Sequence, residues 1–365
     1  MNVTIVHDYL TQRGGAERVV LAMLRAFPDA PVYTSMYHPD STFPAFRDAD
    51  VRVTALDRVR PLRRHHRLAL PLLAATFSRL RVSADVAICS SSGWAHATSV
   101  EGKKVVYCHT PARWLYQRTT YLSARDYAAR IGLALLRPYL VRWDRRAAAT
   151  SDRYLANSSV VRDRIRAAYG IDADVVPPPP ALGPDGVQRP VDGLEPGFYL
   201  CVSRLLAYKN VGAVAAAFAD GAPGKLVIVG TGPEGAKLRA GAGNSVSLVG
   251  SVGDEQLRWL YSSCAGIVAA SYEDYGLTPL EAAAFGKPAA VLRWGGFQDT
   301  VVDGTTGLFF DRPEPREIAA AVHALAARSW NAHEIAAHAD HFSEKTFVER
   351  LRGIVEESVH GEDVA

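Results

Sequence analysis

The sequence predicts an α/β protein of two domains, each built on a parallel β-sheet, and three observations indicate this. Short β-branched runs alternate with longer Ala/Leu/Arg-rich segments at helical spacing, which is typical of βα units whose sheets are buried on both faces. A length of 365 residues suits two domains better than one. Finally, the four-proline run Pro177–Pro180 separates two sets of strand candidates.

The domain boundary is expected at this proline run. Proline fixes φ and removes a hydrogen-bond donor, so the run and the Gly/Pro/Asp-rich stretch after it, up to Gly197, are predicted to be an extended linker outside the core. We expect an N-terminal domain over 1–180, a C-terminal domain over 181–342, and a C-terminal helix within 343–365 that could pack back on the N-terminal domain. The strand candidates are Val3–Val6, Val86–Cys89, Val105–Tyr107, Arg153–Ala156, Tyr199–Val202, Leu226–Val229, Gly266–Ala269 and Ala289–Leu292.

Composition excludes several classes of protein. A hydrophobic content of 48% supports two buried cores and excludes a disordered chain, while a net charge of +3 gives no argument for nucleic-acid binding. The four scattered cysteines are interpreted as reduced, packed thiols. Neither a signal peptide nor an apolar run long enough to span a bilayer is visible, so a cytoplasmic protein is expected.

The most informative segment of the second half runs from Glu273 to Glu281. Pro279 suits the first position of a helix, and Gly276 leaves backbone exposed in the loop before it, so free N–H groups and the helix dipole would form an anion site. Glu281 would lie in the first turn and accept two hydrogen bonds from a vicinal diol such as a ribose. The alternative is that Glu281 is only a favourable helix charge and Glu273 a solvated loop residue.

Two cations and a glycine turn precede this segment. Arg204 and Lys209 follow a predicted strand, where they suit a diphosphate, although a solvated loop pair is an equal alternative. Gly230 and Gly232 follow the next strand as a tight turn, and a lone Gly-x-Gly is weak evidence for a ligand.

The first half carries a matching pair of features. Gly14 and Gly15 follow the first strand and open a helix, which lets backbone approach a phosphate, although a generic turn is the simpler reading. His109 follows the Val105–Tyr107 strand, and a lone histidine there is more often packed than catalytic.

Together these features resemble glycosyltransferase family 4. Glu273 and Glu281 match its E-x7-E motif in a Gly-Leu-x-Pro-Leu-Glu-Ala setting. Asp299 departs from the pattern, because the family more often has Glu there, and this leaves any ligand contact at that position in doubt. The other motifs in family order are Ser203-Arg204-Leu205 with Lys209-Asn210, Gly230-x-Gly232-Pro233, Gly250-Ser251-Val252, and Gly295-Gly296 through Gly304 and Gly307.

The resemblance implies the GT-B architecture, in which two Rossmann-like domains face each other across a cleft that binds a nucleotide-diphosphate sugar. It also implies retention of anomeric configuration by same-face attack, with the leaving phosphate as base and with cations in place of a metal ion, so no cofactor or metal is expected. A histidine at the position of His109 lies against the donor sugar in the family and would orient it, one option being its backbone carbonyl. The implied catalytic residues are His109, Glu273, Arg204 and Lys209, and the implied donor-binding residues are Gly14, Gly15, Arg204, Lys209, Gly230, Val252, Gly276, Leu277, Thr278 and Glu281.

Within the family, the segments His7–Leu10, Ser90–Ser92 and His109–Leu115 look most like mannosyltransferases of bacterial surface-polysaccharide biosynthesis. The expected activity is therefore transfer of mannose from GDP-mannose to a glycan or lipid-linked glycan. Two alternatives stay open: a GT-B sugar-nucleotide epimerase, which needs no acceptor, and a non-catalytic two-domain protein that binds a solute.

A basic segment, Arg58–Arg67, precedes the apolar run Leu68–Phe77. Such a stretch can lie on an anionic membrane, where each basic residue contributes roughly 1 kcal/mol, so peripheral contact with the inner face of the cell membrane is one prediction. The other is a solvated helix face beside a core helix. No nucleic-acid role is expected, because interleaved aromatic residues and binding motifs are lacking.

Overall fold

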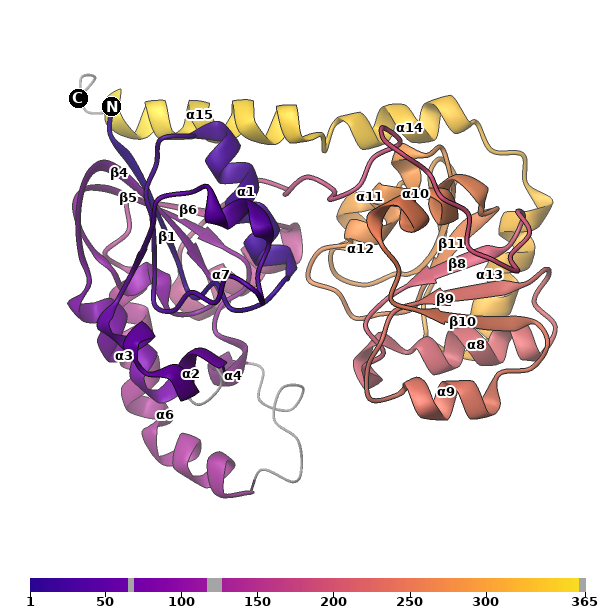
Figure 1. The fold of residues 1–365 in the computed structure, drawn as a ribbon, viewed down its shortest axis with the longest axis horizontal. Coiled ribbons are helices and arrows are strands. Elements are labelled where there is room, and N and C mark those ends of the chain that lie inside the picture. The colour runs from indigo at the N-terminus through magenta and orange to yellow at the C-terminus, as the bar shows by residue number, and fades with distance from the viewer. Residues whose placement is uncertain (65–68, 117–126, 361–365) are drawn as a thin grey trace. The chain divides into compact units, whose positions relative to one another are not determined.

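A computed structural model describes residues 1–64, 69–116 and 127–360. The chain divides into two compact units (Figure 1). Unit 1 comprises residues 1–178 and the segment from Phe347 onward, and unit 2 comprises Pro179–Thr346. The division at Pro178 lies close to the boundary expected at residue 180. Each unit contains a parallel sheet, so the predicted fold class is confirmed.

Unit 1 holds a seven-stranded parallel sheet of order β3-β2-β1-β4-β5-β6-β7. All four strands predicted for this half are present, and β4 is longer than its predicted core. The strands are β1 (Val3–His7), β2 (Val32–Thr34), β3 (Val51–Val53), β4 (Arg81–Ser91), β5 (Ser99–Cys108), β6 (Arg153–Ala156) and β7 (Asp174–Val175). The helices are α1 (Gly15–Ala26), η1 (Pro44–Arg47), η2 (Ala55–Arg58), α2 (Arg60–Arg64), α3 (Leu70–Arg79), η4 (Ala95–Ala97), α4 (Arg113–Tyr116), α6 (Tyr127–Ala148) and α7 (Ser159–Tyr169).

Both faces of this sheet are buried, as continuous apolar strands require. Successive side chains of a strand point to opposite faces, so Ile5 and Tyr107 join one core while Val6 and Cys108 join another. Helix α1 covers the first face. The C-terminal helix α15 (Glu344–His360) also covers it, through buried residues such as Leu351.

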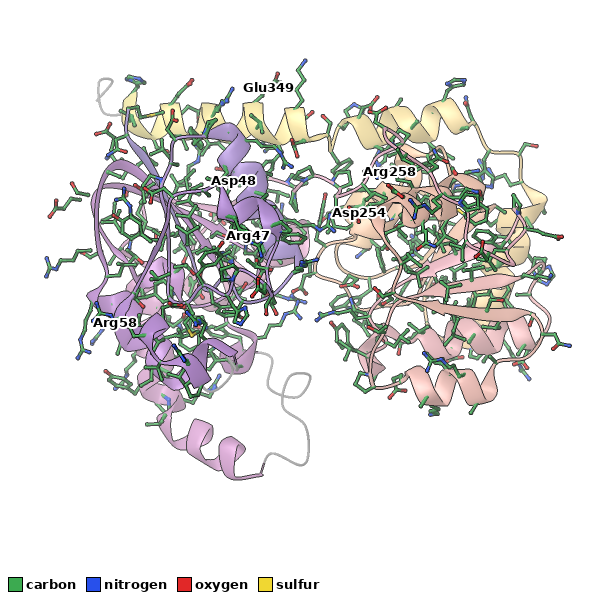
Figure 2. The ribbon with its side chains drawn as sticks, viewed as in Figure 1. Arg47, Asp48, Arg58, Asp254, Arg258 and Glu349 are labelled. Atoms are coloured by element: carbon green, nitrogen blue, oxygen red, sulfur yellow. The ribbon has the colours of Figure 1, made fainter. Side chains whose placement is uncertain are left out.

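The basic segment is partly described. Arg58 ends η2, labelled in Figure 2, and Arg63 of α2 lies 3.4 Å from Asp57. His65, His66 and Arg67 lie outside the described residues. In α3, Leu73 and Phe77 are fully buried, so the apolar run after the basic residues supplies a core helix. Contact with a membrane stays a prediction.

Unit 2 holds a six-stranded parallel sheet of order β10-β9-β8-β11-β12-β13. Helix α8 packs against α13, and α11 packs against α14. The strands are β8 (Tyr199–Val202), β9 (Leu226–Val229), β10 (Val246–Gly250), β11 (Gly266–Ala269), β12 (Ala289–Leu292) and β13 (Gly307–Phe310). The helices are η5 (Ala207–Lys209), α8 (Val211–Ala219), α9 (Gly235–Gly241), α10 (Asp254–Ser263), α11 (Leu277–Ala284), α12 (Phe297–Thr300), α13 (Pro315–Ala327) and α14 (Ala332–Asp340).

The proline-rich linker is extended, as expected, but it is not outside the core. Leu182 is buried in the core of unit 2. The backbone N–H of Arg189 donates to the carbonyl of Glu255 on α10. Gly186 lies over the guanidinium of Arg258, which projects from the same helix (Figure 2).

Two further predictions concern cysteines and membrane spans. All four cysteines are free and buried, as predicted. Within the described ranges, no helix is both long and apolar enough to cross a bilayer.

Candidate functional site

In unit 2, the loops after β8 and β11 diverge from adjacent strands that are distant in sequence. Such a switch point, at the carboxyl edge of a parallel sheet, is where α/β proteins bind ligands. Lys209 comes from the first loop and Glu273 from the second. The ammonium of Lys209 donates to Oε1 of Glu273, and the Ser271 hydroxyl donates to the same oxygen over 3.2 Å. The structure therefore brings together two of the predicted site residues.

The position of Lys209 is set by its neighbour Asn210. Asn210 has φ of 53°, in the left-handed region that asparagine tolerates better than most residues, and this turn separates η5 from α8. The Asn210 amide donates to the carbonyl of Ala270 over 2.9 Å, which joins the two diverging loops. Lys209 is itself only 8% exposed and lies over the ring of Tyr208.

Arg204 differs from Lys209 in burial. It is exposed, and among the described residues none forms an ion pair with it. Its neighbour Leu205 is buried and donates from its N–H to the carbonyl of Thr231 over 2.9 Å, which fixes the loop. Within the part of the chain that the structure describes, the Arg204 side chain is thus a cation without an ion-pair partner on a fixed backbone.

The start of α11 differs from the prediction. The helix begins at Leu277, so Pro279 is its third residue and Glu281 its fifth. Proline is tolerated there because the first four N–H groups of a helix have no intrahelical partner. Glu281 therefore lies beyond the first turn, and it is buried. Its Oε2 accepts a hydrogen bond of 2.7 Å from the hydroxyl of Tyr261 on α10, a contact for which the sequence offers no spacing signal.

The glycines of unit 2 allow loops to pack against one another. A Cβ on Gly230 would collide with the carbonyl of Ser203, and one on Gly232 would collide with that of Leu205. Both have positive φ, so the Gly-x-Gly turn supports the Arg204 loop whether or not it meets a ligand. A Cβ on Gly276 would meet the ring of Phe297.

The remaining predicted residues of unit 2 border these loops. Val252 lies half-buried between β10 and α10, and Leu277 and Thr278 open α11, also half-buried. Burial raises the pKa of the Tyr275 phenol, and the charge of Asp299 on α12 adds to this rise.

The switch point of unit 1 lies between β1 and β4. There Asp8 follows β1, and its two carboxylate oxygens accept 2.7 Å hydrogen bonds from the N–H groups of Ala95 and Ser92. Burial raises the pKa of Asp8 to about 6, although these hydrogen bonds act to lower it. Asp8 thus joins the diverging loops, a function that its position in the sequence did not reveal.

The N-terminus of α1 is partly filled by the protein itself. Glu17 is 1% exposed and folds back toward the backbone of Gly14, where Oε2 would lie only 2.5 Å from an added Cβ. Burial raises the pKa of Glu17 to about 7. An added Cβ on Gly15 would meet no atom within 4 Å. Of the two predicted phosphate contacts, Gly14 therefore serves Glu17, and Gly15 alone has open space.

His109 follows β5, and hydrogen bonds hold both its side chain and its backbone. Its Nε2 lies 2.8 Å from Oγ of Ser90, which lies 3.0 Å from Nδ1 of His7. Its carbonyl accepts a 3.1 Å hydrogen bond from the Asn157 amide. Burial lowers the pKa of His109 to about 3 and that of His7 to about 4, with hydrogen bonds to the backbone of Ser90 and Tyr9 opposing the shift at His7. Both imidazoles are neutral at neutral pH.

A second histidine cluster has the residue types of a hydrolase triad, but a substrate cannot reach its serine. Oγ of Ser91 and Oδ1 of Asp144 each lie 3.0 Å from a ring nitrogen of His96. All three side chains are almost completely buried, and the Ser91 hydroxyl already accepts from the N–H of Gly93. No substrate can reach this serine, so the cluster is structural.

Models of two protein families match the two halves of the chain. A model described as "Glycosyltransferase Family 4" matches residues 13–179, and one described as "Glycosyl transferases group 1" matches residues 188–341. The chain has the GT-B fold. Each of the two family models matches one half of the chain.

Curated proteins with similar sequences match only part of this chain. An alpha-1,3/1,6-mannosyltransferase of Dictyostelium discoideum is 32% identical over 121 residues, which are 32% of this chain and 29% of that protein. A D-inositol 3-phosphate glycosyltransferase of Segniliparus rotundus is 30% identical over 206 residues, 49% of this chain and 45% of the relative. The chain thus spans less than half the length of these relatives.

Solved structures extend the likeness in fold to nearly the whole chain. HepE of Anabaena, crystallised with UDP, superposes with a TM-score of 0.68 at 17% identity, covering 98% of this chain and 100% of that one. AviGT4, a glycosyltransferase involved in avilamycin A biosynthesis, gives 0.60 at 17% identity and covers 99% of both chains.

Proposed function

We propose that this chain transfers a hexosyl group, with mannose from GDP-mannose as our specific assignment, to a glycan or lipid-linked glycan acceptor. The observation that carries the proposal is the switch point of unit 2. There the Lys209–Glu273 pair and the exposed Arg204 lie in loops at the carboxyl edge of the sheet. Two cations at such an edge suit a diphosphate, and the family models support a glycosyl donor that contains one.

The proposed chemistry divides the work between charges and neutral groups. Breaking the bond between sugar and diphosphate places negative charge on the leaving group, which Arg204 and Lys209 would stabilise. We propose that these cations take the place of a metal ion and that the leaving phosphate accepts the acceptor's proton on the same face, which retains the anomeric configuration. Neutral His109 would orient the sugar.

The donor base is tested by thermal stabilisation with GDP, UDP and ADP. The likeness to a mannosyltransferase supports GDP-mannose, whereas HepE, crystallised with UDP and with UDP-glucose, makes UDP the natural competitor. A nucleotide at 100 times its Kd adds about 2.7 kcal/mol to the free energy of unfolding. GDP is expected to stabilise most. Stabilisation by none of the three would contradict the proposal.

Arg204→Ala is the sharpest test of the diphosphate assignment. Because Arg204 is exposed and unpaired among the described residues, its removal is expected to leave the fold unchanged. The turnover rate should fall about a hundredfold or more. Lys209→Ala is expected to abolish turnover too. The measurement is the rate of donor hydrolysis or transfer.

Arg239→Ala is the matched control. It removes another exposed arginine of unit 2, from the last turn of α9, at the end of that helix remote from the carboxyl edge. Its turnover should equal that of the unaltered protein. Normal turnover in both Arg204→Ala and Lys209→Ala would exclude the diphosphate site.

A further inference from the structure

The side chains of His7, Ser90 and His109 form one continuous row of hydrogen bonds across three adjacent strands. His7 ends β1, Ser90 is its partner on β4, and His109 follows β5. Nδ1 of His7 lies 3.0 Å from Oγ of Ser90, and this oxygen lies 2.8 Å from Nε2 of His109. His7 and Ser90 are at most 2% exposed, so they cannot contact a substrate themselves.

The direction of this row follows from the backbone carbonyl of Ser90. That oxygen lies 3.2 Å from Nδ1 of His7 and can only accept, and the Ser90 hydroxyl lies 3.0 Å from the same nitrogen, so these two contacts favour the hydrogen on Nδ1 over a donation to the backbone of Tyr9. The Ser90 hydroxyl then accepts from His7 and donates its own hydrogen to Nε2 of His109. The opposite direction would set the lone pair of Nδ1 against the carbonyl oxygen, which is repulsive.

A neutral imidazole that accepts at Nε2 carries its hydrogen on Nδ1. Among the described residues, none hydrogen-bonds to Nδ1 of His109, and this residue is only partly buried. We infer that His7 and Ser90 are positioning residues that hold His109 as the Nδ1–H tautomer, so that His109 offers a hydrogen-bond donor to an oxygen of the hexose. The part that concerns the hexose rests on the proposed function, whereas the tautomer does not.

This assignment gives His109 a defined chemical role. Its only basic nitrogen is occupied by the Ser90 hydroxyl, so His109 neither removes a proton nor attacks the sugar. The Nδ1–H group is oriented when the protein folds, so its orientation costs no further free energy when the sugar binds.

The tautomer is tested by long-range proton–nitrogen NMR on the full chain with 15N-labelled histidine. The His109 signals are assigned by their loss in His109→Gln. We expect Nδ1 to be protonated and Nε2 unprotonated in the unaltered protein. In Ser90→Ala the hydroxyl is lost and the Nε2–H form should appear, while Ser90→Thr keeps the hydroxyl and should keep the original pattern. An Nε2–H tautomer in the unaltered protein, or no change in Ser90→Ala, would overturn the inference.

A kinetic measurement tests the contact with the hexose. Ser90→Ala is expected to lower kcat/KM by about tenfold, the size of one lost hydrogen bond, and Ser90→Thr to restore it. The Kd of the nucleoside diphosphate alone should be the same in both variants, because it lacks the hexose. Equal kcat/KM in Ser90→Ala would overturn the sugar contact. If no nucleotide sugar is turned over at all, the proposed function fails, and the NMR result still decides the tautomer.

Discussion

The two sheets solve the same problem at their switch points with different chemistry. In unit 1, Asp8 joins the diverging loops by accepting backbone hydrogen bonds, and the groups around it are neutral histidines and a buried carboxyl, Glu17. In unit 2, the loops are joined by the Lys209–Glu273 ion pair and the Asn210 amide. The difference teaches that burial in unit 1 disfavours charge on its titratable groups, whereas unit 2 keeps an ion pair at its edge.

Asp8→Ala is expected to have the largest effect on stability. It leaves the buried N–H groups of Ser92 and Ala95 without acceptors, which should cost about 3 kcal/mol. The free energy of unfolding is measured by urea titration. A loss confined to well under 1 kcal/mol would show that the loops of unit 1 do not depend on this carboxylate.

Glu17→Gln tests the claim that unit 1 disfavours charge. Because the pKa of Glu17 rises from 4.5 to about 7 on folding, its contribution to stability is complete below pH 4.5 and is lost as pH rises through 7. The glutamine variant has no such loss. Relative to the unaltered protein it should gain roughly 2 kcal/mol of stability between pH 5 and pH 8.

The buried histidines also make stability depend on pH, with a sign opposite to that of Glu17. The pKa values of His7 and His109 are lowered, so their contribution is present above pH 6.5 and is lost as pH falls through about 4 and about 3. Both proteins contain these histidines, and the difference between the two stability curves isolates Glu17. A difference that does not change with pH would contradict the buried position of this carboxyl.

Lys209→Ala should have the smallest effect on stability. The Glu273 side chain is 26% exposed, so water screens the charge that remains, and a loss of about 1 kcal/mol is expected. Lys209→Ala combined with Glu273→Gln should recover most of it, because no unpaired carboxylate is left. The single and double variants are compared by thermal unfolding, and a loss as large as that of Asp8→Ala would erase the contrast between the units.

Sequence reasoning found the fold because the fold depends on local patterns. All eight predicted strands are present, since each is a compact β-branched run. The candidates did not include β2, β3 and β7, whose two or three residues give no periodic signal, nor the edge strands β10 and β13 of unit 2. The start of α11 was misplaced because Pro279 is tolerated at several positions of a first turn.

The candidate site was predicted only in part, for a different reason. Lys209 and Glu273 stood out because they follow strands that parallel topology brings together. The contacts of Tyr261 with Glu281 and of Ser90 with His109 were not predicted, since they are set by side-chain packing between distant segments. Buried polar contacts of that kind follow from three-dimensional proximity and leave no spacing rule in the chain.

The position of α15 at the end of the chain affects the order in which the two units fold. Unit 1 needs Phe347, Leu351 and their neighbours on α15 to close one face of its sheet, yet these residues are synthesised after all of unit 2. Unit 2 is one continuous stretch, so its core can form while the segment after it is still being synthesised. The half of the enzyme whose synthesis starts first is therefore the half that finishes folding last, and until then it presents an open apolar face.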